Sequence, residues 1–319
     1  MVVATPESWF PAADPPLSRW REGGRRTLKT VTRTFGWLKG HGTENDFVVL
    51  PDPDGSVHGR LDPALVAALC HRRRGIGADG VLRVVRSKAA AAEYDDVPPD
   101  DEAAWFMDYR NADGSLSQMC GNGVRVYARF LAEAGLVDTT AALPIGTRGG
   151  VVYAHFLDDG GDSGDISVDM GHARLLGQVQ ISAGGRTWTA TKVSTGNPHA
   201  VVAVDDLAEA GLLSEPPSYD PADFPDGVNV EFVREVVPGH VAMRVFERGS
   251  GETRSCGTGA CAAAVAHISE RGIPRPVRLR VDVPGGRLDV SWDEEGGVVL
   301  TGPAVLGPRG DLDPTWLAR

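Results

Sequence analysis

Two cysteines stand in the same short motif at two distant places in the chain. Cys120 lies in "MCGNG" (119–123), and Cys256 lies in "SCGTG" (255–259). A helix-like run follows each motif, so each thiol is expected at or just before a helix N-terminus. There the positive end of the helix dipole and the free N–H groups stabilise a thiolate, which predicts a lowered thiol pKa. The glycines let those N–H groups reach a carboxylate as well.

The residues upstream of the two motifs repeat in the same order. Nine residues before each cysteine stands a polar residue that ends a strand-like segment, Asn111 in "YRNADG" and Glu247 in "FERGSG". Farther upstream, "GTENDFVVL" is loosely matched by "STGNPHAVVAV". These matches indicate a duplicated α/β unit with one cysteine in each copy. If the copies pack face to face, a thiolate and a thiol would flank one carbon, as needed to invert a stereocentre beside a carboxylate.

Strand and helix signals indicate the elements that must position the thiols. Asp62 and Pro63 begin a helix, which we expect to close with a basic last turn, "HRRR" (71–74). The run after Cys120 predicts an amphipathic helix, and "ACAAAVAHISERG" (260–272) predicts a fully buried one. The strands do not alternate regularly with helices, which disfavours a doubly wound sheet.

Composition narrows the class of protein. The chain has 319 residues and a net charge of −11, which argues against nucleic acid or an anionic membrane as a partner. No apolar stretch approaches a membrane span, and four cysteines do not form a secreted disulfide framework, so we expect a cytoplasmic protein. Residues 1–34 predict a loosely ordered extension, and 87–103 an acidic surface loop; neither is assigned a function.

At these motifs the chain closely resembles the diaminopimelate epimerase family. Those enzymes interconvert LL- and meso-diaminopimelate, for lysine and peptidoglycan synthesis, without pyridoxal phosphate. From about residue 37 the resemblance covers nearly the whole chain. The matching blocks are "KGHGTENDF" (39–47), "RRGIGADG" (73–80), "RNADGSLSQMCGNGVR" (110–125), "TGNPH" (195–199), "GVN" (227–229) and "ERGSGETRSCGTGACAA" (247–263).

The resemblance implies a role for each matching residue. Cys120 and Cys256 would be the acid–base pair, Glu247 would hold the reacting ammonium, Arg248 the distal carboxylate, and His199 would support the site. Other matching residues would bind the substrate's carboxylate through N–H groups or its polar ends through amides: Gly121, Asn122, Gly257, Thr258, Asn45, Asn111, Asn197 and Asn229. Many family members have Gln where this chain has Gly80, so that contact would be lost or supplied by water.

Together, the duplication and the resemblance imply an α+β fold. It would have two similar domains, each a curved, mostly antiparallel sheet around a buried helix, with the site in the cleft between them. We expect domains at 35–172 and 173–302, with the tail 303–319 returning to the first. The resemblance also implies a homodimer that acts on a small-molecule substrate and uses no cofactor.

Other interpretations stay open at this point. A proline or hydroxyproline racemase could use the same thiol pair, although "MCGNG" differs from the Cys-Gly-His typical of those enzymes. The two cysteines could instead form a regulatory disulfide. The asparagines could merely cap turns, and His199 could be an ordinary core histidine. We predict no metal site, because Cys256 and Cys261 lack a common zinc spacing, and no pyridoxal phosphate, because no lysine lies in a phosphate-binding context.

Overall fold

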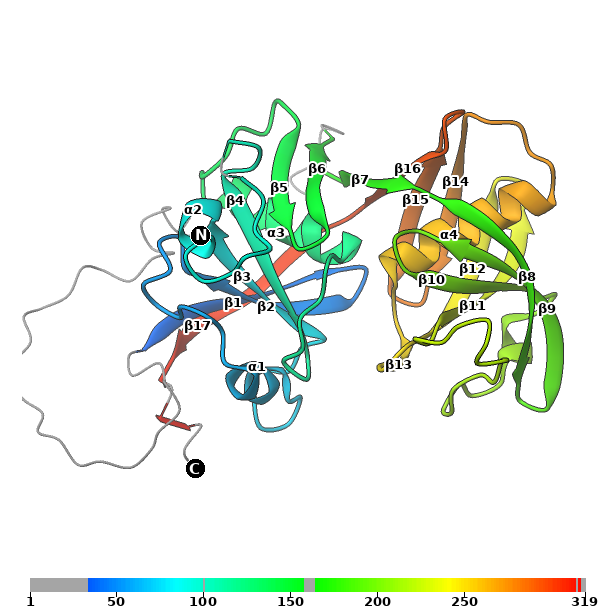
Figure 1. Cartoon of the computed structure of the whole chain (residues 1–319), viewed down its shortest axis with the longest axis horizontal. Helices are drawn as coiled ribbons and strands as arrows, with labels where there is room; N and C mark the ends of the chain where they lie inside the picture. The colour runs from blue at the N-terminus through cyan, green and yellow to red at the C-terminus, as the bar shows by residue number, and fades with distance from the viewer. Residues whose placement is uncertain (1–33, 100, 158–163, 314, 317–319) are drawn as a thin grey trace, which may run out of the picture.

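The computed structural model describes residues 34–99, 101–157, 164–313 and 315–316 (Figure 1). The predicted N-terminal extension therefore lies outside the described residues, apart from Thr34. The helices are α1 (Pro63–Cys70), α2 (Ser87–Ala90), α3 (Gly121–Glu133) and α4 (Gly257–Glu270), and η2 (Leu207–Ala210) is a 3-10 helix. In the described part of the chain, no helix has the length and apolar character needed to cross a membrane.

The strands form one continuous, mostly antiparallel sheet, which is bent into two lobes (Figure 1). The strands of the first half are β1 (Phe35–Gly42), β2 (Asn45–Pro51), β3 (Gly80–Arg86), β4 (Trp105–Asn111), β5 (Leu143–Thr147), β6 (Gly150–Phe156) and β7 (Ile166–His172). Those of the second half are β8 (Arg174–Ala183), β9 (Arg186–Ser194), β10 (Pro198–Ala203), β11 (Asn229–Val237), β12 (His240–Glu247), β13 (Gly251–Thr253), β14 (Val277–Val283), β15 (Gly286–Trp292), β16 (Gly297–Gly302) and β17 (Val305–Leu312).

The pattern of strand pairing repeats in the two halves, as a duplicated unit predicts. In the first lobe the spatial order is β17, β1, β2, β3, β4, β5, β6, β7, in which only β2–β3 and β4–β5 are parallel pairs. In the second lobe it is β8, β9, β10, β11, β12, β14, β15, β16, and the parallel pairs β10–β11 and β12–β14 hold the same places. The last strand, β17, thus completes the first lobe in the position that β8 holds in the second.

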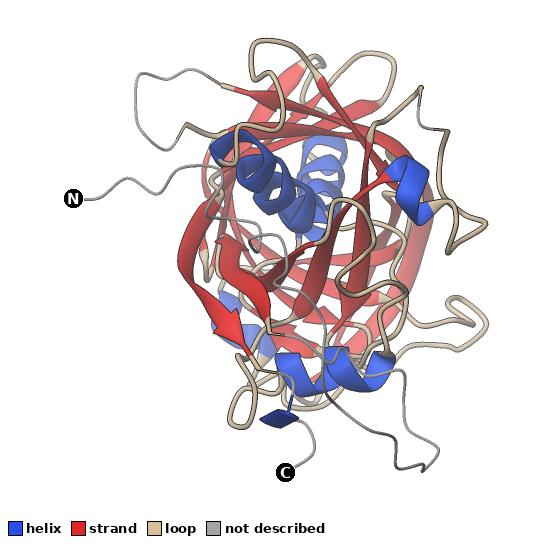
Figure 2. Cartoon of the chain, turned by 90° about the vertical axis from the view of Figure 1, so that its left-hand side faces the viewer, coloured by secondary structure: helices blue, strands red, loops and turns tan. Residues whose placement is uncertain are grey.

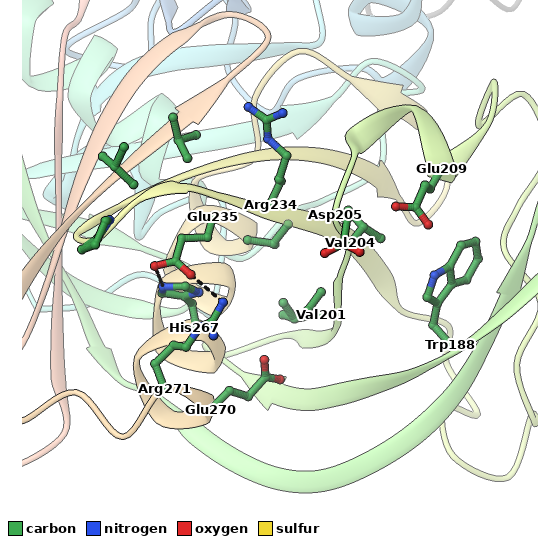
Figure 3. Close-up of a pocket in the computed structure, with 15 residues that line it drawn as sticks. Trp188, Val201, Val204, Asp205, Glu209, Arg234, Glu235, His267, Glu270 and Arg271 are labelled. Atoms are coloured by element: carbon green, nitrogen blue, oxygen red, sulfur yellow. Dashed lines mark hydrogen bonds and ion pairs between the residues drawn. The ribbon is translucent and has the colours of Figure 1, made fainter.

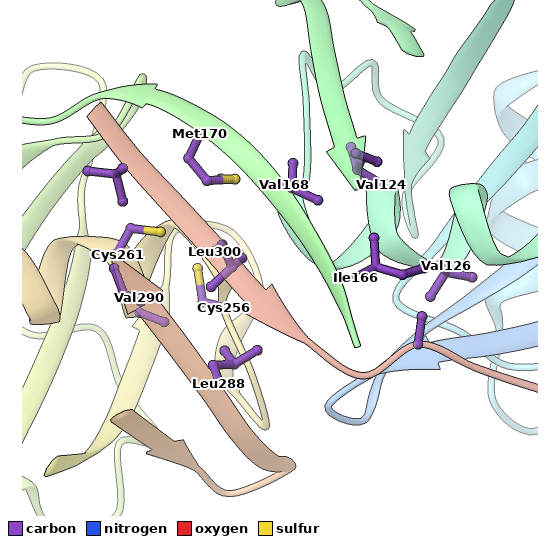
Figure 4. Packing of buried hydrophobic residues seen from close by; sticks show 14 of the residues in the cluster. Val124, Val126, Ile166, Val168, Met170, Cys256, Cys261, Leu288, Val290 and Leu300 are labelled. Carbon is purple, nitrogen blue, oxygen red and sulfur yellow. The ribbon is translucent and has the colours of Figure 1, made fainter. Parts of the chain in front are cut away.

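Each lobe wraps its sheet around one long helix, α3 in the first and α4 in the second (Figure 2). The predicted fully buried helix is confirmed: from Gly259 to Ile268 every residue of α4 is buried. Small alanine side chains let the surrounding strands approach α4 from all sides. The strands β7 and β16 pair with each other and join the lobes, so both helices contribute to one hydrophobic cluster (Figure 4).

Two local expectations need correction. The helix α1 does begin at Asp62 and Pro63, with the Asp62 side chain accepting from Ala64 N, but it ends at Cys70, before the basic run. The backbone of His71 is extended, and its ring Nδ1 accepts hydrogen bonds from the backbone N–H groups of Arg73 and Arg74. These bonds turn the chain away from the helix axis. Arg72 then pairs with Asp46 and Asp79 at 2.8 and 2.7 Å instead of serving the helix end.

The segment predicted as an acidic surface loop is anchored to a buried charged network. It begins with α2, and Tyr94 is buried beneath it. Glu93 accepts two hydrogen bonds from Arg83, a fully buried guanidinium on β3 that also donates to Asp52 at 2.8 Å. The Tyr94 hydroxyl donates to Asp108 at 3.0 Å. The loop therefore supplies partners for charges that would be costly to bury alone.

The two lobes meet at the turn between β1 and β2. Thr43 and Glu44 form this turn with φ values of 49° and 63°, a conformation that costs a β-branched residue energy unless its surroundings hold it. The Thr43 hydroxyl lies 2.6 Å from that of Ser255, and Glu44 pairs with Arg254, both on the second lobe. A Cβ added at Gly285, in the turn between β14 and β15, would lie 1.8 Å from the Thr43 carbonyl oxygen. Contacts from the second lobe therefore hold the strained turn in place.

We predict that Gly285→Ala disrupts the contact between Gly285 and Thr43 and so destabilises the protein. The added methyl group cannot fit against the Thr43 carbonyl, so the free energy of unfolding should fall by about 1–3 kcal/mol, the usual cost of overpacking. Urea unfolding measures the change. The control is Gly310→Ala, where the new Cβ meets only atoms at 3.6 Å or beyond. Equal stability of the two variants would contradict the prediction.

Candidate active site

Both predicted cysteines cap helices, and they do so in the same way. Cys120 is the N-cap of α3, with φ −145° and ψ 117°, and its Sγ accepts from Gly123 N at 3.4 Å. Cys256 is the N-cap of α4, with φ −125° and ψ 117°, and its Sγ accepts from Gly259 N at 3.3 Å. The repeated motif thus gives each thiol the same orientation toward the free N–H groups of its helix.

The starts of α3 and α4 lie against each other. A Cβ at Gly257 would lie 3.3 Å from Asn122 Oδ1 and 3.0 Å from Leu300 Cδ2, so a glycine permits this close approach. Leu300, on β16, lies in the cluster that joins the lobes and also contains Cys256 (Figure 4). The two helix N-termini, one from each lobe, therefore converge on one place.

Polar side chains connect the two helix starts. Asn122 is fully buried, and its Nδ2 lies 3.2 Å from Asn45 Oδ1 and 3.2 Å from Ser255 Oγ. Asn45 Oδ1 also accepts from the Cys120 thiol at 3.7 Å. Ser255 directly precedes Cys256, so this set of bonds runs from one cysteine to the neighbour of the other.

The orientation of Asn45 is fixed from behind. Its Nδ2 donates to Asp79 Oδ2 at 2.8 Å, and Asp79 is itself paired with Arg72. Because a carboxylate only accepts, the amide nitrogen must face Asp79 and the amide oxygen must face Cys120. Arg72, which belongs to the basic run expected at a helix end, thus supports the site.

The sequence predicted that the helix N-termini lower the pKa values of both thiols, but on balance these pKa values are raised. Burial raises the pKa of Cys120 to about 11, although the N–H groups of Gly123 and Asn122 lower it in part. Burial, followed by the carboxylates of Glu247 and Glu231, raises the pKa of Cys256 well above its usual value. The prediction of lowered pKa values is therefore wrong, because desolvation outweighs the helix ends.

Three further predicted residues lie together at the ends of β11 and β12. Asn229 Oδ1 accepts from Arg248 N at 2.9 Å, and Arg248 Nη1 donates to Asp226 O at 2.5 Å. Glu247 accepts from the Thr253 hydroxyl. Burial raises the pKa of Glu247, while hydrogen bonds from Thr253 and Cys256 lower it in part. The structure thus brings the Glu247 carboxylate to Cys256.

The remaining predicted residues of the second lobe form a chain of hydrogen bonds. His199 is fully buried, and its Nε2 lies 2.9 Å from Asn197 Oδ1. Asn197 Nδ2 donates to Thr258 Oγ1 at 3.3 Å, and that oxygen lies 3.5 Å from Cys256 Sγ. His199 therefore reaches the thiol only through two intermediate side chains.

Asn111 is placed differently from the other asparagines. It ends β4, beside Gly80 in the register with β3, and its Nδ2 donates to Ser115 Oγ at 3.0 Å. This bond is the turn-capping role that asparagine often has. A Cβ at Gly80 would lie 2.7 Å from Tyr109 Cε2, so this backbone has no room for a longer side chain.

Sequence reasoning missed several residues of the site. Glu231 bonds His199, Ser255 bonds Asn122, and Thr43 bonds Ser255. Burial, then Cys120, Glu247, Asp79 and Cys256, raises the pKa of Tyr109, which therefore lies near both thiols. Ser255 and Thr43 lie within the matching blocks, at 247–263 and 39–47, which is the signal that could have indicated them.

Neither a metal-binding cluster of the described residues nor the cavity in the second lobe lies at this site. Among residues 34–99, 101–157, 164–313 and 315–316, no group of three or more His, Cys, Asp or Glu side chains is arranged to hold a metal ion. A cavity of about 780 Å³ lies at the other end of α4, where Glu235 approaches His267 and Arg271 (Figure 3). Its lining contains none of the predicted site residues.

Comparison with known proteins indicates the family of the chain. The family profile described as diaminopimelate epimerase matches residues 37–176 and 191–307. The chain is 54% identical to the diaminopimelate epimerase of Streptomyces coelicolor, over 90% of this chain and 98% of the relative. It is 50% identical to that of Mycolicibacterium smegmatis, over 88% and 97%. The fold resembles a hydroxyproline epimerase from Agrobacterium vitis, with a TM-score of 0.62, 18% identity, and 90% and 92% of the two chains covered.

The fold prediction is confirmed, since the chain has the α+β architecture of these relatives. The matched residues include both cysteine motifs and nearly all of both lobes. The chain belongs to the diaminopimelate epimerase family.

Proposed function

We propose that this protein interconverts LL- and meso-diaminopimelate, with Cys120 and Cys256 as the two groups that exchange a proton with the α-carbon. The observation that carries the proposal is the convergence of two helix N-termini, each capped by a thiol in the same orientation. Relatives about half identical over almost their whole length are named diaminopimelate epimerase, which supports the choice of substrate.

The reaction needs no change of oxidation state. One cysteine acts as a thiolate and removes the α-proton, breaking the C–H bond and leaving its electron pair on the carbon. The other cysteine, as a thiol, donates its proton to the opposite face of that carbon and becomes the thiolate. Backbone N–H groups at Gly121, Asn122, Gly257 and Thr258 would hold the adjacent carboxylate and stabilise the charge that develops on it.

Side chains around the thiols match the other groups of a diamino dicarboxylate. The buried carboxylate of Glu247 would accept from the reacting ammonium, next to Cys256. Asn45, Asn197 and Asn229 would bind polar groups of the substrate, while Asn111 and Arg248 would bind its distal end. A long substrate with a second charged end distinguishes this activity from proline racemisation.

We also propose how the whole molecule is organised. Segments 35–172 and 173–302 would act as two domains, with 303–319 returning to the first, and would close on the substrate. Closure would exclude water and strengthen the thiolate as a base. The resemblance to the family supports a homodimer, and the cysteine usage supports a cytoplasmic location.

We predict that Cys120→Ala and Cys256→Ala each abolish epimerisation under reducing conditions. Each variant lacks either the proton acceptor or the proton donor, so kcat should fall by at least about 100-fold in both directions. Conversion of LL- to meso-diaminopimelate, resolved by chiral chromatography, measures the loss. Cys70→Ala is the matched control, since Cys70 is buried in α1 of the first lobe. Full activity of either site variant would contradict the two-thiol proposal, and turnover of L-proline by the wild type would favour a racemase.

The pH dependence follows from the raised pKa values. Burial raises the pKa of Cys120 to about 11 and that of Cys256 well above normal, so both are thiols in the free protein at neutral pH. Since the reaction needs one thiolate and one thiol, kcat/KM should rise with pH throughout the neutral range, toward the pKa of about 11 at Cys120, and fall only where both thiols ionise. Initial rates at low substrate concentration measure this profile. A kcat/KM that falls as the pH rises through the neutral range would contradict this prediction.

A further inference from the structure

A buried glutamate that the proposed reaction does not use stands at the start of the hydrogen-bond chain to Cys256. Glu231 lies on β11 and is fully buried, with its Oε1 2.7 Å from His199 Nδ1. Its Oε2 has no hydrogen-bond partner among the described residues. A buried carboxyl with one partner is costly, and burial raises its pKa. Its hydrogen bond to His199 is therefore the side-chain contact that offsets the cost of burying the carboxyl group.

The chain continues through three more side chains to the sulfur. His199 Nε2 lies 2.9 Å from Asn197 Oδ1, Asn197 Nδ2 donates to Thr258 Oγ1 at 3.3 Å, and Thr258 Oγ1 lies 3.5 Å from Cys256 Sγ. Glu231 itself packs against the first turn of α4, since a Cβ at position 259 would lie 2.7 Å from its Oε1. Strands β10 and β11 and the helix α4 thus each contribute to the chain.

The bonds have a defined direction. Because the Asn197 amide nitrogen donates to Thr258, the amide oxygen faces His199, which must therefore carry a hydrogen on Nε2. Thr258 Oγ1 accepts from Asn197, which leaves its own hydrogen free to point at Cys256 Sγ. A hydroxyl donated to sulfur favours the thiolate that the reaction requires.

We propose that Glu231 is a positioning residue that keeps a hydrogen on His199 Nε2 and thereby directs the Thr258 hydroxyl toward Cys256. Nε2 keeps its hydrogen in two forms of this pair: a protonated Glu231 that donates to Nδ1 of a neutral ring, or an imidazolium that donates from Nδ1 to the Glu231 carboxylate. This inference rests on the proposed function of Cys256. The other carboxylate that faces Cys256, Glu247, lies on β12 outside the chain.

Two substitutions of Glu231 distinguish the effect of its hydrogen bond to His199 from the effect of its charge. Glu231→Met has similar length and cannot bond Nδ1, so kcat should fall about 10- to 100-fold as the chain loses its orientation. Glu231→Gln can donate an amide N–H to Nδ1 and leave the hydrogen on Nε2, so it should retain most of the wild-type kcat. The control is Glu235→Met on the same strand, where the glutamate pairs with Arg271 away from the site. A Met variant as active as this control, or a Gln variant as impaired as the Met variant, would overturn the proposal.

A second measurement does not depend on turnover. Long-range ¹H–¹⁵N correlation spectra of the full chain report which ring nitrogens of each histidine carry hydrogen, and the missing signal in His199→Gln assigns His199. We expect a protonated Nε2 in the wild type and in Glu231→Gln, and a mixture of ring forms in Glu231→Met. An Nε2 without hydrogen in the wild type would overturn the proposal. If the wild type fails to epimerise diaminopimelate, the proposed function fails, but the spectra still decide the role of Glu231.

Discussion

The site depends on the close contact between the N-termini of α3 and α4. Each helix is the buried centre of its own lobe, so its position is fixed by the sheet around it. Asn122 and Ser255 join the two helix starts by hydrogen bonds, and Leu300 packs between them. The strained Thr43 turn is held by the second lobe at the same place. A shift of either lobe would therefore move one thiol relative to the other, and the chemistry proposed here has little tolerance for that.

Two opposing effects act on the thiols. The helix N-termini supply N–H groups that favour thiolates, while burial favours neutral thiols and prevails for both cysteines. Both sulfurs are therefore thiols in the free protein, and the N–H groups at the helix N-termini lower the cost of ionising one of them for the reaction. At Cys256, the hydrogen bond with the Thr258 hydroxyl lowers the thiol pKa in part, whereas the carboxylate of Glu247 raises it.

The sequence predicted the features that depend on local pattern. The repeated Cys-Gly-x-Gly motif predicted two equivalent helix caps, and the alanine-rich run predicted a buried helix. The end of α1 was misplaced because the ring of His71 accepts hydrogen bonds from the backbone of the basic run and so turns the chain before it. The predicted shifts of the thiol pKa values had the wrong sign, because desolvation depends on tertiary packing, which no short segment of sequence shows. Glu231 was missed for the same reason: its partner His199 lies 32 positions away in the chain.

The fate of the α-proton tests the central claim most directly. LL-diaminopimelate is converted in deuterated water under reducing conditions, and both substrate and product are analysed at low conversion by mass spectrometry. Two thiols on opposite faces predict meso product with one deuterium at the inverted carbon, while the recovered LL substrate keeps its proton. Meso product that retains the original proton, or LL substrate that gains deuterium as fast as product forms, would contradict the account.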